Sequence, residues 1–405
     1  MKILQINCVY QSGSTGKIVC DIHSELLNRD IQSVVCYGRG KKVNIPNVYK
    51  IFCESYFMFN SLRCKITGLI YGGAYCSTRL LEHFILKEKP DIVHLQCING
   101  YFVNIYKLVD FLKVNHIKTL ITLHAEFMYT ANCGHAFDCN RWMIGCGNCP
   151  QFKELDPWFF DRTATSWKKM KKAFEGFNDG LIIVSVSPWL MNRAKCSPML
   201  SGKKHTVVLN GLNTDIFHFY KNSNLKESLR LNENKILVFH VSPNFTNEIN
   251  NIKGGYYLIE LAKQMPDFQF VVAGPYANDI KVPDNVKLLG RIKDQSLLAQ
   301  YYSTADICVL TSKKETFSMV CAESLCCGTP IVGFKAGAPE MIALKKYSEF
   351  VDFGDVRALK HAIIRMTEEK ISKVTISAEA IKVYSKERMT AEYIQLYREL
   401  LNYGN

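Results

Sequence analysis

Residues 307–334 read ICVLTSKKETFSMVCAESLCCGTPIVGF, and this stretch indicates the fold class. An apolar run at 307–310 predicts a buried strand, and a second run at 331–334 predicts another. Between them, residues 318–327 form a helical pattern. Parallel strands need such a crossover connection, so the stretch predicts a parallel sheet covered by helices.

The same alternation of strands and helices continues along the chain. Short β-rich runs predict strands at 2–9, 33–37, 91–95, 118–123, 181–186, 235–241, 269–272, 287–289, 307–310 and 331–334. Amphipathic stretches predict helices at 17–27, 79–87, 105–114, 166–177, 255–264, 295–303, 318–327 and 356–367. The pattern pauses in the Asn- and Lys-rich segment 210–224, so we expect two doubly wound sheets, one after the other.

The composition is that of a folded protein with an excess of positive charge. Among its 405 residues, 50 Lys and Arg oppose 37 Asp and Glu, for a formal net charge of +13, and 48% of residues are hydrophobic. The excess is concentrated in the first 200 residues, which favours an anionic partner such as a nucleotide or a lipid head group. No RRM, KH or zinc-finger pattern occurs, so we expect no nucleic-acid partner.

The sequence contains no feature that predicts export or membrane insertion. Its first residues, MKILQINCVY, carry one Lys, and Gln and Asn interrupt the apolar run, unlike a signal peptide. No apolar stretch approaches the ~20 residues needed to span a bilayer. We therefore expect a cytoplasmic protein in which most of the 16 cysteines are reduced core residues.

The first predicted strand leads into QSGSTGK at residues 11–17. Small residues there would let a phosphate approach the backbone, and a helix N-terminus attracts negative charge. The stretch is not a Walker A loop, because Gln11 stands where the first glycine belongs and Ile18 replaces the Ser or Thr. A tight strand–helix turn without a ligand is the alternative.

Two carboxylates are placed for ligand binding near the carboxyl end of a strand. Glu315 follows the strand at 307–310, and Glu323 lies within the helix that begins near residue 318. Carboxylates suit hydroxyl-rich ligands, and the free N–H groups of the helix suit phosphate. The alternative is an exposed loop residue and a helix-surface residue with no shared ligand.

The motif E-x-F-x-M-V-x-x-E-x-L-x-x-G-T-P-I-V at 315–332, followed by GAPE at 337–340, closely resembles the E-x7-E region of family four glycosyltransferases. Further blocks resemble that family in the same order, at 1–17, 91–97, 122–150, 208–217, 253–255 and 289–306. Within that family, the chain resembles the bacterial enzymes that build capsule, exopolysaccharide or O-antigen. The resemblance implies the α/β GT-B fold: Rossmann-like domains at 1–205 and 206–385 facing a cleft, and a C-terminal helix at 386–405 packing back on the first domain.

The resemblance also implies individual roles. Glu315 would lie beside the donor sugar, Lys253 would neutralise the diphosphate leaving group, and His124 would reach the sugar or the reacting centre. For His124, a structural histidine is the alternative. Glu323 would bind the ribose, Gly290 and Arg291 would frame the base pocket, and the remaining donor-binding residues would be Thr15, Gly16, Phe317, Ser318, Met319 and Val320.

The chain departs from the family at three positions. Ala125 follows the histidine where Asp is frequent, and Asn213 replaces the Asp of the block at 210–213. The segment FHVS at 239–242 lacks the Arg that many members carry on this strand, which removes one cation near the leaving phosphate. Residues that could replace this Arg are Arg291, Lys313 and Lys314.

The resemblance implies a retaining transferase that moves a hexose from a UDP- or GDP-linked donor to a polyprenyl-linked oligosaccharide. The departing phosphate would take the acceptor proton, so neither a general base nor a catalytic metal is expected. A nucleotide-sugar 2-epimerase of the same fold and a non-catalytic nucleotide-sugar-binding protein are the alternatives.

Basic and aromatic side chains are interleaved in two segments of the first domain, which suits an anionic membrane surface. We therefore expect peripheral association with the inner leaflet of the cytoplasmic membrane; the alternative is a solvated helix face over the core. The residues concerned are Tyr56, Phe57, Phe59, Arg63, Lys65, Leu69, Ile70, Tyr71 and Arg79 in 55–86, and Trp167, Lys168, Lys169, Met170, Lys171, Lys172 and Phe174 in 166–177.

Four cysteines at 133–149 follow the pattern C-x5-C-x6-C-x2-C. The last pair resembles half of a zinc knuckle, and Gly145 and Gly147 would let the backbone turn its sulfurs towards one centre. The alternatives are a disulfide pair, disfavoured in a reducing compartment, and four unligated core thiols, disfavoured by the polar and irregular segment; His135 could substitute as a ligand. The residues expected to bind a structural zinc ion are Cys133, Cys139, Cys146 and Cys149.

Overall fold

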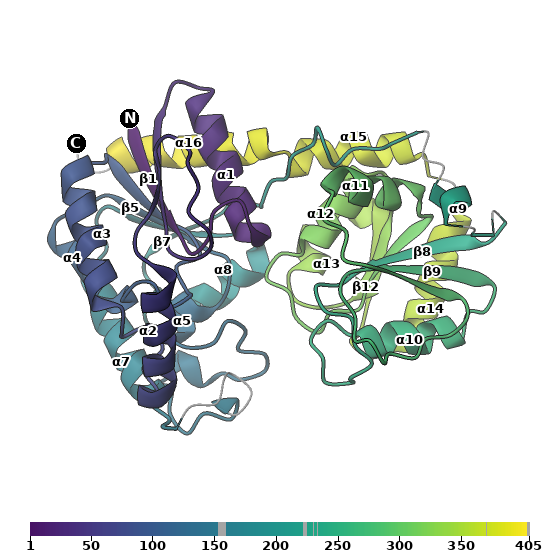
Figure 1. Cartoon of the computed structure of the whole chain (residues 1–405), viewed down its shortest axis with the longest axis horizontal. Helices are drawn as coiled ribbons and strands as arrows, with labels where there is room; N and C mark the ends of the chain where they lie inside the picture. The colour runs from purple at the N-terminus through teal and green to yellow at the C-terminus, as the bar shows by residue number, and fades with distance from the viewer. Residues whose placement is uncertain (153–158, 222–224, 230, 233, 370, 403–405) are drawn as a thin grey trace. The chain divides into compact units, whose positions relative to one another are not determined.

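The computed structural model describes residues 1–152, 159–221, 225–229, 231–232, 234–369 and 371–402 (Figure 1). The chain divides into two compact units. One comprises Met1–Leu209 with Met389–Asn405, and the other comprises Asn210–Arg388. Each unit contains one parallel sheet, which confirms the predicted pair of α/β sheets.

The first unit has a seven-stranded sheet of order β3-β2-β1-β4-β5-β6-β7. Helices cover both faces of this sheet, so an inner strand such as β5 is buried along its whole length (Figure 1). The strands are β1 (Lys2–Asn7), β2 (Gln32–Tyr37), β3 (Val48–Lys50), β4 (Ile92–Leu95), β5 (Thr119–Leu123), β6 (Leu181–Ser185) and β7 (Lys204–Val207). The helices are α1 (Gly13–Leu27), α2 (Glu54–Thr67), α3 (Tyr75–Glu88), α4 (Ile105–Val114), α5 (Phe127–Thr130), the 3₁₀ turn η1 (Arg141–Met143), α7 (Thr163–Phe174), α8 (Pro188–Lys195) and α16 (Lys386–Asn402).

The C-terminal helix α16 completes the core of the first unit. Met389, Tyr393, Tyr397 and Leu400 recur at helical spacing and are buried. They join α1 and the central strands in one hydrophobic cluster, which also contains Ile3, Ile18, Ile22, Leu26, Ile92, Leu120, Ile182 and Val184. The last residues of the chain therefore stabilise a sheet formed by its first 209 residues.

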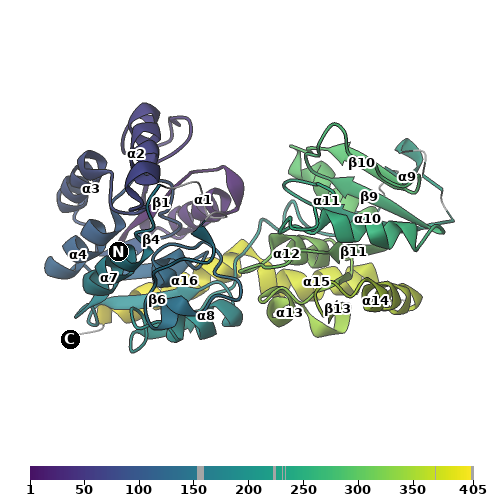
Figure 2. The ribbon, with the colours of Figure 1, turned by 90° about the horizontal axis from the view of Figure 1, so that it is seen from below.

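The second unit has a six-stranded sheet of order β10-β9-β8-β11-β12-β13 (Figure 2). Its strands are β8 (Ile236–Val241), β9 (Phe268–Ala273), β10 (Val286–Gly290), β11 (Ile307–Leu310), β12 (Ile331–Phe334) and β13 (Ser348–Val351). Its helices are α9 (Leu225–Ser228), α10 (Gly255–Lys263), α11 (Gln295–Thr304), α12 (Met319–Cys326), α13 (Pro339–Ile342), the 3₁₀ turn η2 (Lys345–Tyr347), α14 (Val356–Glu368) and α15 (Lys373–Tyr384).

Three strands were not predicted, and all three lie at sheet edges. β3, β7 and β13 are short and mostly half-buried, so they lack the continuous apolar run that marks an inner strand. No helix in the described part of the chain is long and apolar enough to cross a membrane.

Candidate functional site

Two loops of the second unit meet where the strand order of its sheet reverses. β8 and β11 are neighbours at this point, and the loops that follow them carry Lys253 and Glu315. Lys253 Nζ lies 2.6 Å from Glu315 Oε1, with 28% and 16% of the two side chains exposed. Open α/β sheets bind their ligands at such a switch point, outside the carboxyl ends of the strands. The structure thus brings together two of the three residues predicted to be catalytic.

Backbone contacts hold these loops against each other. Gly254 has φ +68°, and a Cβ atom there would lie 2.1 Å from the carbonyl oxygen of Thr311, so only glycine fits. The Thr311 hydroxyl donates to the carbonyl of Lys253 at 3.0 Å. The N–H of Lys313 donates to the carbonyl of Ile252 at 2.8 Å. The position of Lys253 is therefore fixed by its backbone as well as by its ion pair.

The loop after β12 fixes the backbone of Glu315. The N–H of Glu315 donates to the carbonyl of Ala336 at 2.9 Å, and the carbonyl of Glu315 accepts from the N–H of Ala338 at 3.2 Å. The carboxylate of Glu340 in turn accepts from the N–H groups of Ala336 and Gly337 at 3.0 and 2.9 Å. Glu340 is thus part of the frame of the site, although no role was predicted for it.

The N-terminus of α12 follows directly after Glu315. Its N-cap, Ser318, has φ +82°, a region that non-glycine residues rarely occupy, and its side chain makes no capping hydrogen bond in the described structure. The first N–H groups of a helix have no partner within it, and they attract anions. Residues 317–320 therefore lie beside Glu315 in a position suited to phosphate.

Glu323 lies farther along α12 and is half-buried. Its Oε2 accepts a hydrogen bond of 3.0 Å from the hydroxyl of Tyr302, a buried residue of α11. Burial and the neighbouring carboxylate raise the pKa of Tyr302 well above its usual value, so its hydroxyl stays protonated and donates. This hydrogen bond holds Glu323 in place.

Gly290 and Arg291 lie apart from the ion pair. Gly290 ends β10 with φ +71°, and Arg291 is exposed. In the sheet, β9 separates β10 from β8. The structure thus places these two residues at the same sheet end as Lys253 but after a strand two positions away from β8.

His240 on β8 is a site neighbour that was not predicted. Its Nδ1 lies 2.9 Å from the carbonyl of Val309 and therefore donates, while its buried Nε2 has no hydrogen-bond partner among the described residues. Burial lowers the pKa of His240 to about 4, and the charge of Lys253 acts in the same direction. The only signal in the sequence was its place in FHVS, the segment that lacks the family's Arg.

In the first unit, His124 follows β5 and is buried. Its Nε2 lies 2.8 Å from Oε1 of Gln96. Because an amide oxygen only accepts, His124 carries its proton on Nε2 and Nδ1 is its acceptor nitrogen. Burial lowers the pKa of His124 to about 4, so the ring is neutral at pH 7.

Gln96 connects His124 to a buried hydrogen-bond chain that ends on α16. Gln96 Nε2 lies 3.4 Å from Nδ1 of His94. The same Nδ1 is 2.7 Å from the hydroxyl of Tyr397, and Nε2 of His94 is 2.8 Å from the hydroxyl of Thr122. Thr122 in turn lies 3.0 Å from the hydroxyl of Tyr393. In the sequence, polar residues within otherwise apolar strands were the feature that could have indicated this hydrogen-bond chain.

Thr15 and Gly16 lie in the first turns of α1, which begins at Gly13 rather than near residue 17 as predicted. Gly16 is buried, and a Cβ atom there would lie 3.1 Å from a methyl group of Val9. The N–H of Gln11 donates to the carbonyl of Gly16 at 3.0 Å. The segment is therefore a short turn that leads directly into a helix, and the phosphate contact of Thr15 and Gly16 stays a prediction.

The four clustered cysteines line one small cavity of the first unit. All 16 thiols of the chain are free. Burial raises the pKa of Cys146 to about 12 and also raises the pKa of Cys133. No three His, Cys, Asp or Glu side chains among the described residues form a ready metal-binding group.

The expected membrane-facing aromatics divide into buried and exposed sets. On α7, Trp167, Met170 and Phe174 are buried, so the core-facing alternative holds for this helix. In the other segment, Phe57, Ile70 and Tyr71 are buried as well. One face of α2 is instead exposed and apolar; it is formed by Met58 (64% exposed), Phe59 (65%), Leu62 (56%) and Ile66 (45%).

Part of the chain is similar in sequence to known glycosyltransferases. Residues 243–369 match the family described as "Glycosyl transferases group 1". The chain is 27% identical over 174 residues to a putative colanic acid biosynthesis glycosyl transferase, WcaC, of Escherichia coli K12; the match covers 40% of this chain and 42% of that protein. The chain therefore spans less than half the length of this relative.

Solved structures match over almost the whole chain. Sucrose-phosphate synthase from Thermosynechococcus elongatus superposes with a TM-score of 0.67 at 16% identity, covering 99% of this chain and 100% of that one. The chain has the GT-B fold. HepE from Anabaena, solved in complex with UDP, gives a TM-score of 0.63 at 14% identity, covering 98% of this chain and 100% of that one. Within this GT-B chain, the group 1 match contains Lys253, Glu315 and α12.

Proposed function

We propose that the chain is a retaining family four glycosyltransferase. It would move a hexose from a nucleoside-diphosphate sugar to a lipid-linked saccharide during synthesis of a bacterial surface polysaccharide. The observation that carries the proposal is the Lys253–Glu315 pair beside the N-terminus of α12, within the group 1 glycosyltransferase match. The name of the similar E. coli protein and the UDP complex of the Anabaena protein support the polysaccharide role and the class of donor.

In this proposal, Lys253 and α12 stabilise the departing diphosphate. Negative charge develops on the phosphate as the bond to the sugar breaks, and fixed donors aimed at that charge lower the barrier. Lys253 supplies a cation, and the N–H groups of residues 317–320 supply dipoles. We assign the role of the missing Arg to Lys313 or Lys314, which share the loop of Glu315; Arg291 follows a more distant strand.

Glu315 and His124 would orient the sugar. The carboxylate of Glu315 would accept hydrogen bonds from hydroxyl groups of the donor sugar. When the donor binds, Lys253 would leave Glu315 and contact the phosphate instead. His124, which burial keeps neutral at pH 7, would contact the sugar or the reacting centre. The leaving phosphate takes the proton of the acceptor hydroxyl, so no side chain needs to act as a general base.

The exposed face of α2 would bring this enzyme to its lipid-linked acceptor. Met58, Phe59, Leu62 and Ile66 recur at helical spacing, and Arg63 and Lys65 lie between them. The N–H of Phe159, itself 75% exposed, donates to the carbonyl of Lys65 and extends the apolar surface. Apolar side chains inserted beside cations suit the interface of an anionic leaflet. We therefore propose peripheral association of this cytoplasmic enzyme with the inner leaflet of the cell membrane.

A thermal-shift screen of UDP- and GDP-sugars tests the proposed class of donor. A ligand at ~100 times its dissociation constant adds ~2.7 kcal/mol to stability, so one donor should raise Tm clearly above the other members of the panel. The matching free nucleoside diphosphate should give a smaller rise. A panel with no stabilising nucleotide sugar would contradict the proposal.

Incubation with the selected donor alone separates the alternatives. The proposed transferase should release nucleoside diphosphate slowly by hydrolysis and leave the sugar configuration at C2 unchanged. A 2-epimerase would convert the donor without acceptor, and a binding protein would leave it intact.

A further inference from the structure

The segment Cys133–Cys149 is a long loop whose only regular element is the 3₁₀ turn Arg141–Met143. Loops of this length with little secondary structure are uncommon in compact domains and usually have a function. All four of its cysteines line the same cavity. The loop therefore brings four thiols together without a helix or sheet to support them.

Thr130, at the end of α5, contacts two of these cysteines. Its hydroxyl donates to the carbonyl of Cys133 and accepts from the N–H of Cys133, both at 3.0 Å. The thiol of Cys146 lies 3.7 Å from the carbonyl of Thr130, to which it donates. The first and third cysteines of the motif are thus anchored at one residue.

The other two cysteines have their backbone fixed independently. The N–H of Cys139 donates to the carbonyl of Ala136 at 2.9 Å. The carbonyl of Cys139 accepts from the indole N–H of Trp142 at 2.7 Å. The N–H of Cys149 donates to the carboxylate of Asp161 at 2.7 Å. Hydrogen bonds therefore constrain the main chain of two residues that line the cavity.

The turn between Cys146 and Cys149 has a backbone that requires glycine. Gly145 and Gly147, on either side of Cys146, have φ +145° and +142°. The guanidinium of Arg141 donates to the carbonyls of Gly147 and Asn148, both at 2.7 Å. This side chain stabilises the turn that presents the last two sulfurs.

The side chain of Asn132 lines the cavity and carries a buried oxygen without a hydrogen-bond donor among the described residues. Asn132, only 3% exposed, lines the cavity together with the cysteines, and its Oδ1 has no hydrogen-bond partner among the described residues. A buried acceptor without a partner is costly, and it indicates a donor or a cation nearby.

We propose that Cys133, Cys139, Cys146 and Cys149 bind one structural Zn²⁺ ion in this cavity. Four sulfur ligands in a closed tetrahedral set are typical of structural zinc, and the C-x2-C pair supplies two of them from one turn. The sulfurs reach the ion by turning inward about χ1, which moves them while the backbone stays in place. The zinc ion would then add a fixed centre to a loop that otherwise rests on Trp142 and on hydrogen bonds.

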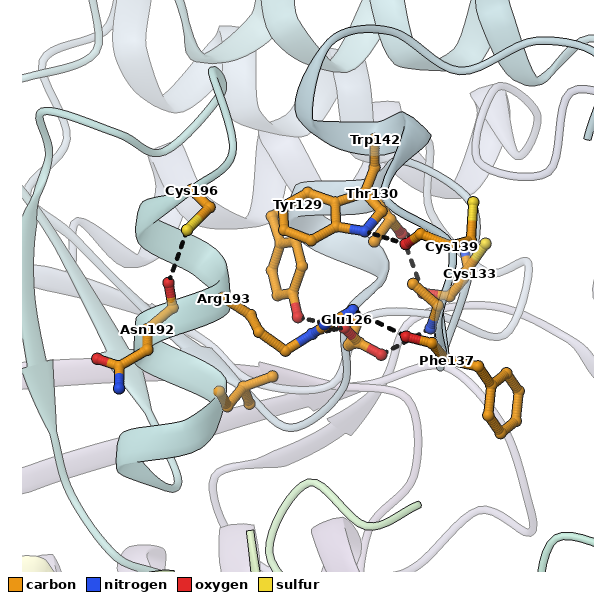
Figure 3. Close-up of polar contacts among 12 residues, drawn as sticks. Glu126, Tyr129, Thr130, Cys133, Phe137, Cys139, Trp142, Asn192, Arg193 and Cys196 are labelled. Carbon is orange, nitrogen blue, oxygen red and sulfur yellow. Dashed lines mark hydrogen bonds and ion pairs between the residues drawn. The ribbon is translucent and has the colours of Figure 1, made fainter. Parts of the chain in front are cut away.

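The site would order the segment that follows His124. Glu126 is fully buried, and its carboxylate accepts from the N–H of Ala136 inside the loop at 2.6 Å. The same carboxylate binds the guanidinium of Arg193 at 2.6 Å and the hydroxyl of Tyr129 (Figure 3). Glu126 therefore links the cysteine loop to α8 and to the residues directly after His124.

Metal analysis of the full chain, purified under reducing conditions without an affinity metal, tests this site. The wild type should contain about one zinc per chain. Cys146→Ser should lose it, whereas Cys196→Ser should retain it. Cys196 is the matched control because it is exposed, lies outside the loop at the end of α8, and its thiol donates to the carbonyl of Asn192 (Figure 3).

Cobalt titration of zinc-stripped wild type keeps the test decisive if Cys146→Ser does not fold. Four-thiolate binding predicts an intense sulfur-to-cobalt charge-transfer band that zinc abolishes, together with protection of four thiols from alkylation. The proposal would be overturned by a zinc-free wild type that gives no such band. A disulfide between any two of the four residues in the reduced preparation, or full zinc in Cys146→Ser, would also overturn it.

Discussion

The short contact between Lys253 and Glu315 has a direct consequence at the residue scale. Each side chain neutralises the other, so a bound donor must offer both a replacement anion for Lys253 and hydroxyl groups for Glu315. A diphosphate sugar has both. The pair is partly exposed, so its net contribution to stability is small, and its loss should affect turnover far more than folding.

Glu315→Gln tests whether the pair contributes to turnover rather than to stability. We expect kcat to fall by 10²–10³, about 3–4 kcal/mol of transition-state stabilisation, because the amide carries no charge. Its Tm should stay close to that of the wild type. A Gln variant with near-wild-type kcat would show that the charge of Glu315 takes no part in catalysis.

Glu323→Gln should behave differently. The amide oxygen can still accept from the hydroxyl of Tyr302, so no buried donor is left unpaired. A ribose contact is the same in the ground state and the transition state, so we expect a higher donor KM with kcat unchanged. Steady-state kinetics with the donor varied check this; a lower kcat at unchanged KM would contradict the ribose assignment.

His240 should make stability depend on pH. Its folded pKa, about 4, is below the usual value of about 6.5, so between these values the unfolded state binds more protons and stability falls as the pH falls. His240→Asn should reduce that slope by up to one proton, ~1.4 kcal/mol per pH unit. Denaturant unfolding between pH 7 and 4.5 measures it, and unchanged slopes would contradict a neutral buried His240.

At the scale of elements, α2 and α7 show when a sequence can indicate which face of a helix packs on the core. On α7, Trp167, Met170 and Phe174 share one helical face, and that periodicity marks a core-facing side. The lysines between them only cover the opposite face. On α2, apolar residues occur on both sides, so the sequence alone could not show whether Phe57 or Phe59 faces the core.

Substitution on α2 tests the proposed membrane contact. Phe59→Glu and Leu62→Glu together should abolish flotation with vesicles that contain anionic lipid, because they place two charges on the inserted face. Val374→Glu on α15 is the control, since Val374 is also exposed (61%) but lies in the other unit. Equal flotation of the wild type and the α2 variant would contradict the assignment.

At the scale of the whole molecule, the local motifs were predictable and the long-range contacts were not. The strand–loop–helix unit around Glu315 is continuous in sequence, so its pattern alone located the carboxylate and the helix N-terminus. The contact of His94 with Tyr397 joins residues 303 positions apart. No periodicity encodes such a pairing, and it forms only because α16 packs on a sheet built from the start of the chain.

The same limit applies to the loops that hold Lys253 and Glu315. Lys253 and Glu315 are 62 positions apart and meet because β8 and β11 become neighbours in the sheet. Local sequence could place each residue in a loop, and only the resemblance to a known family placed them in one site. Two supports were assigned no role from the sequence. Glu340 binds backbone N–H groups of the loop just before it, and His240 binds the backbone carbonyl of Val309 on the neighbouring strand.

Release of nucleoside diphosphate is the measurement that tests the central claim most directly. Wild type and Lys253→Ala would be compared with the nucleotide sugar that stabilises the protein, in the presence of lipid-linked saccharide extracted from bacterial membranes. We predict that the wild type releases the diphosphate and adds the sugar to the lipid fraction, with its anomeric configuration retained, and that Lys253→Ala does so at least 10²-fold more slowly. Equal release by the two proteins, or transfer by neither, would contradict the proposed reaction and its site.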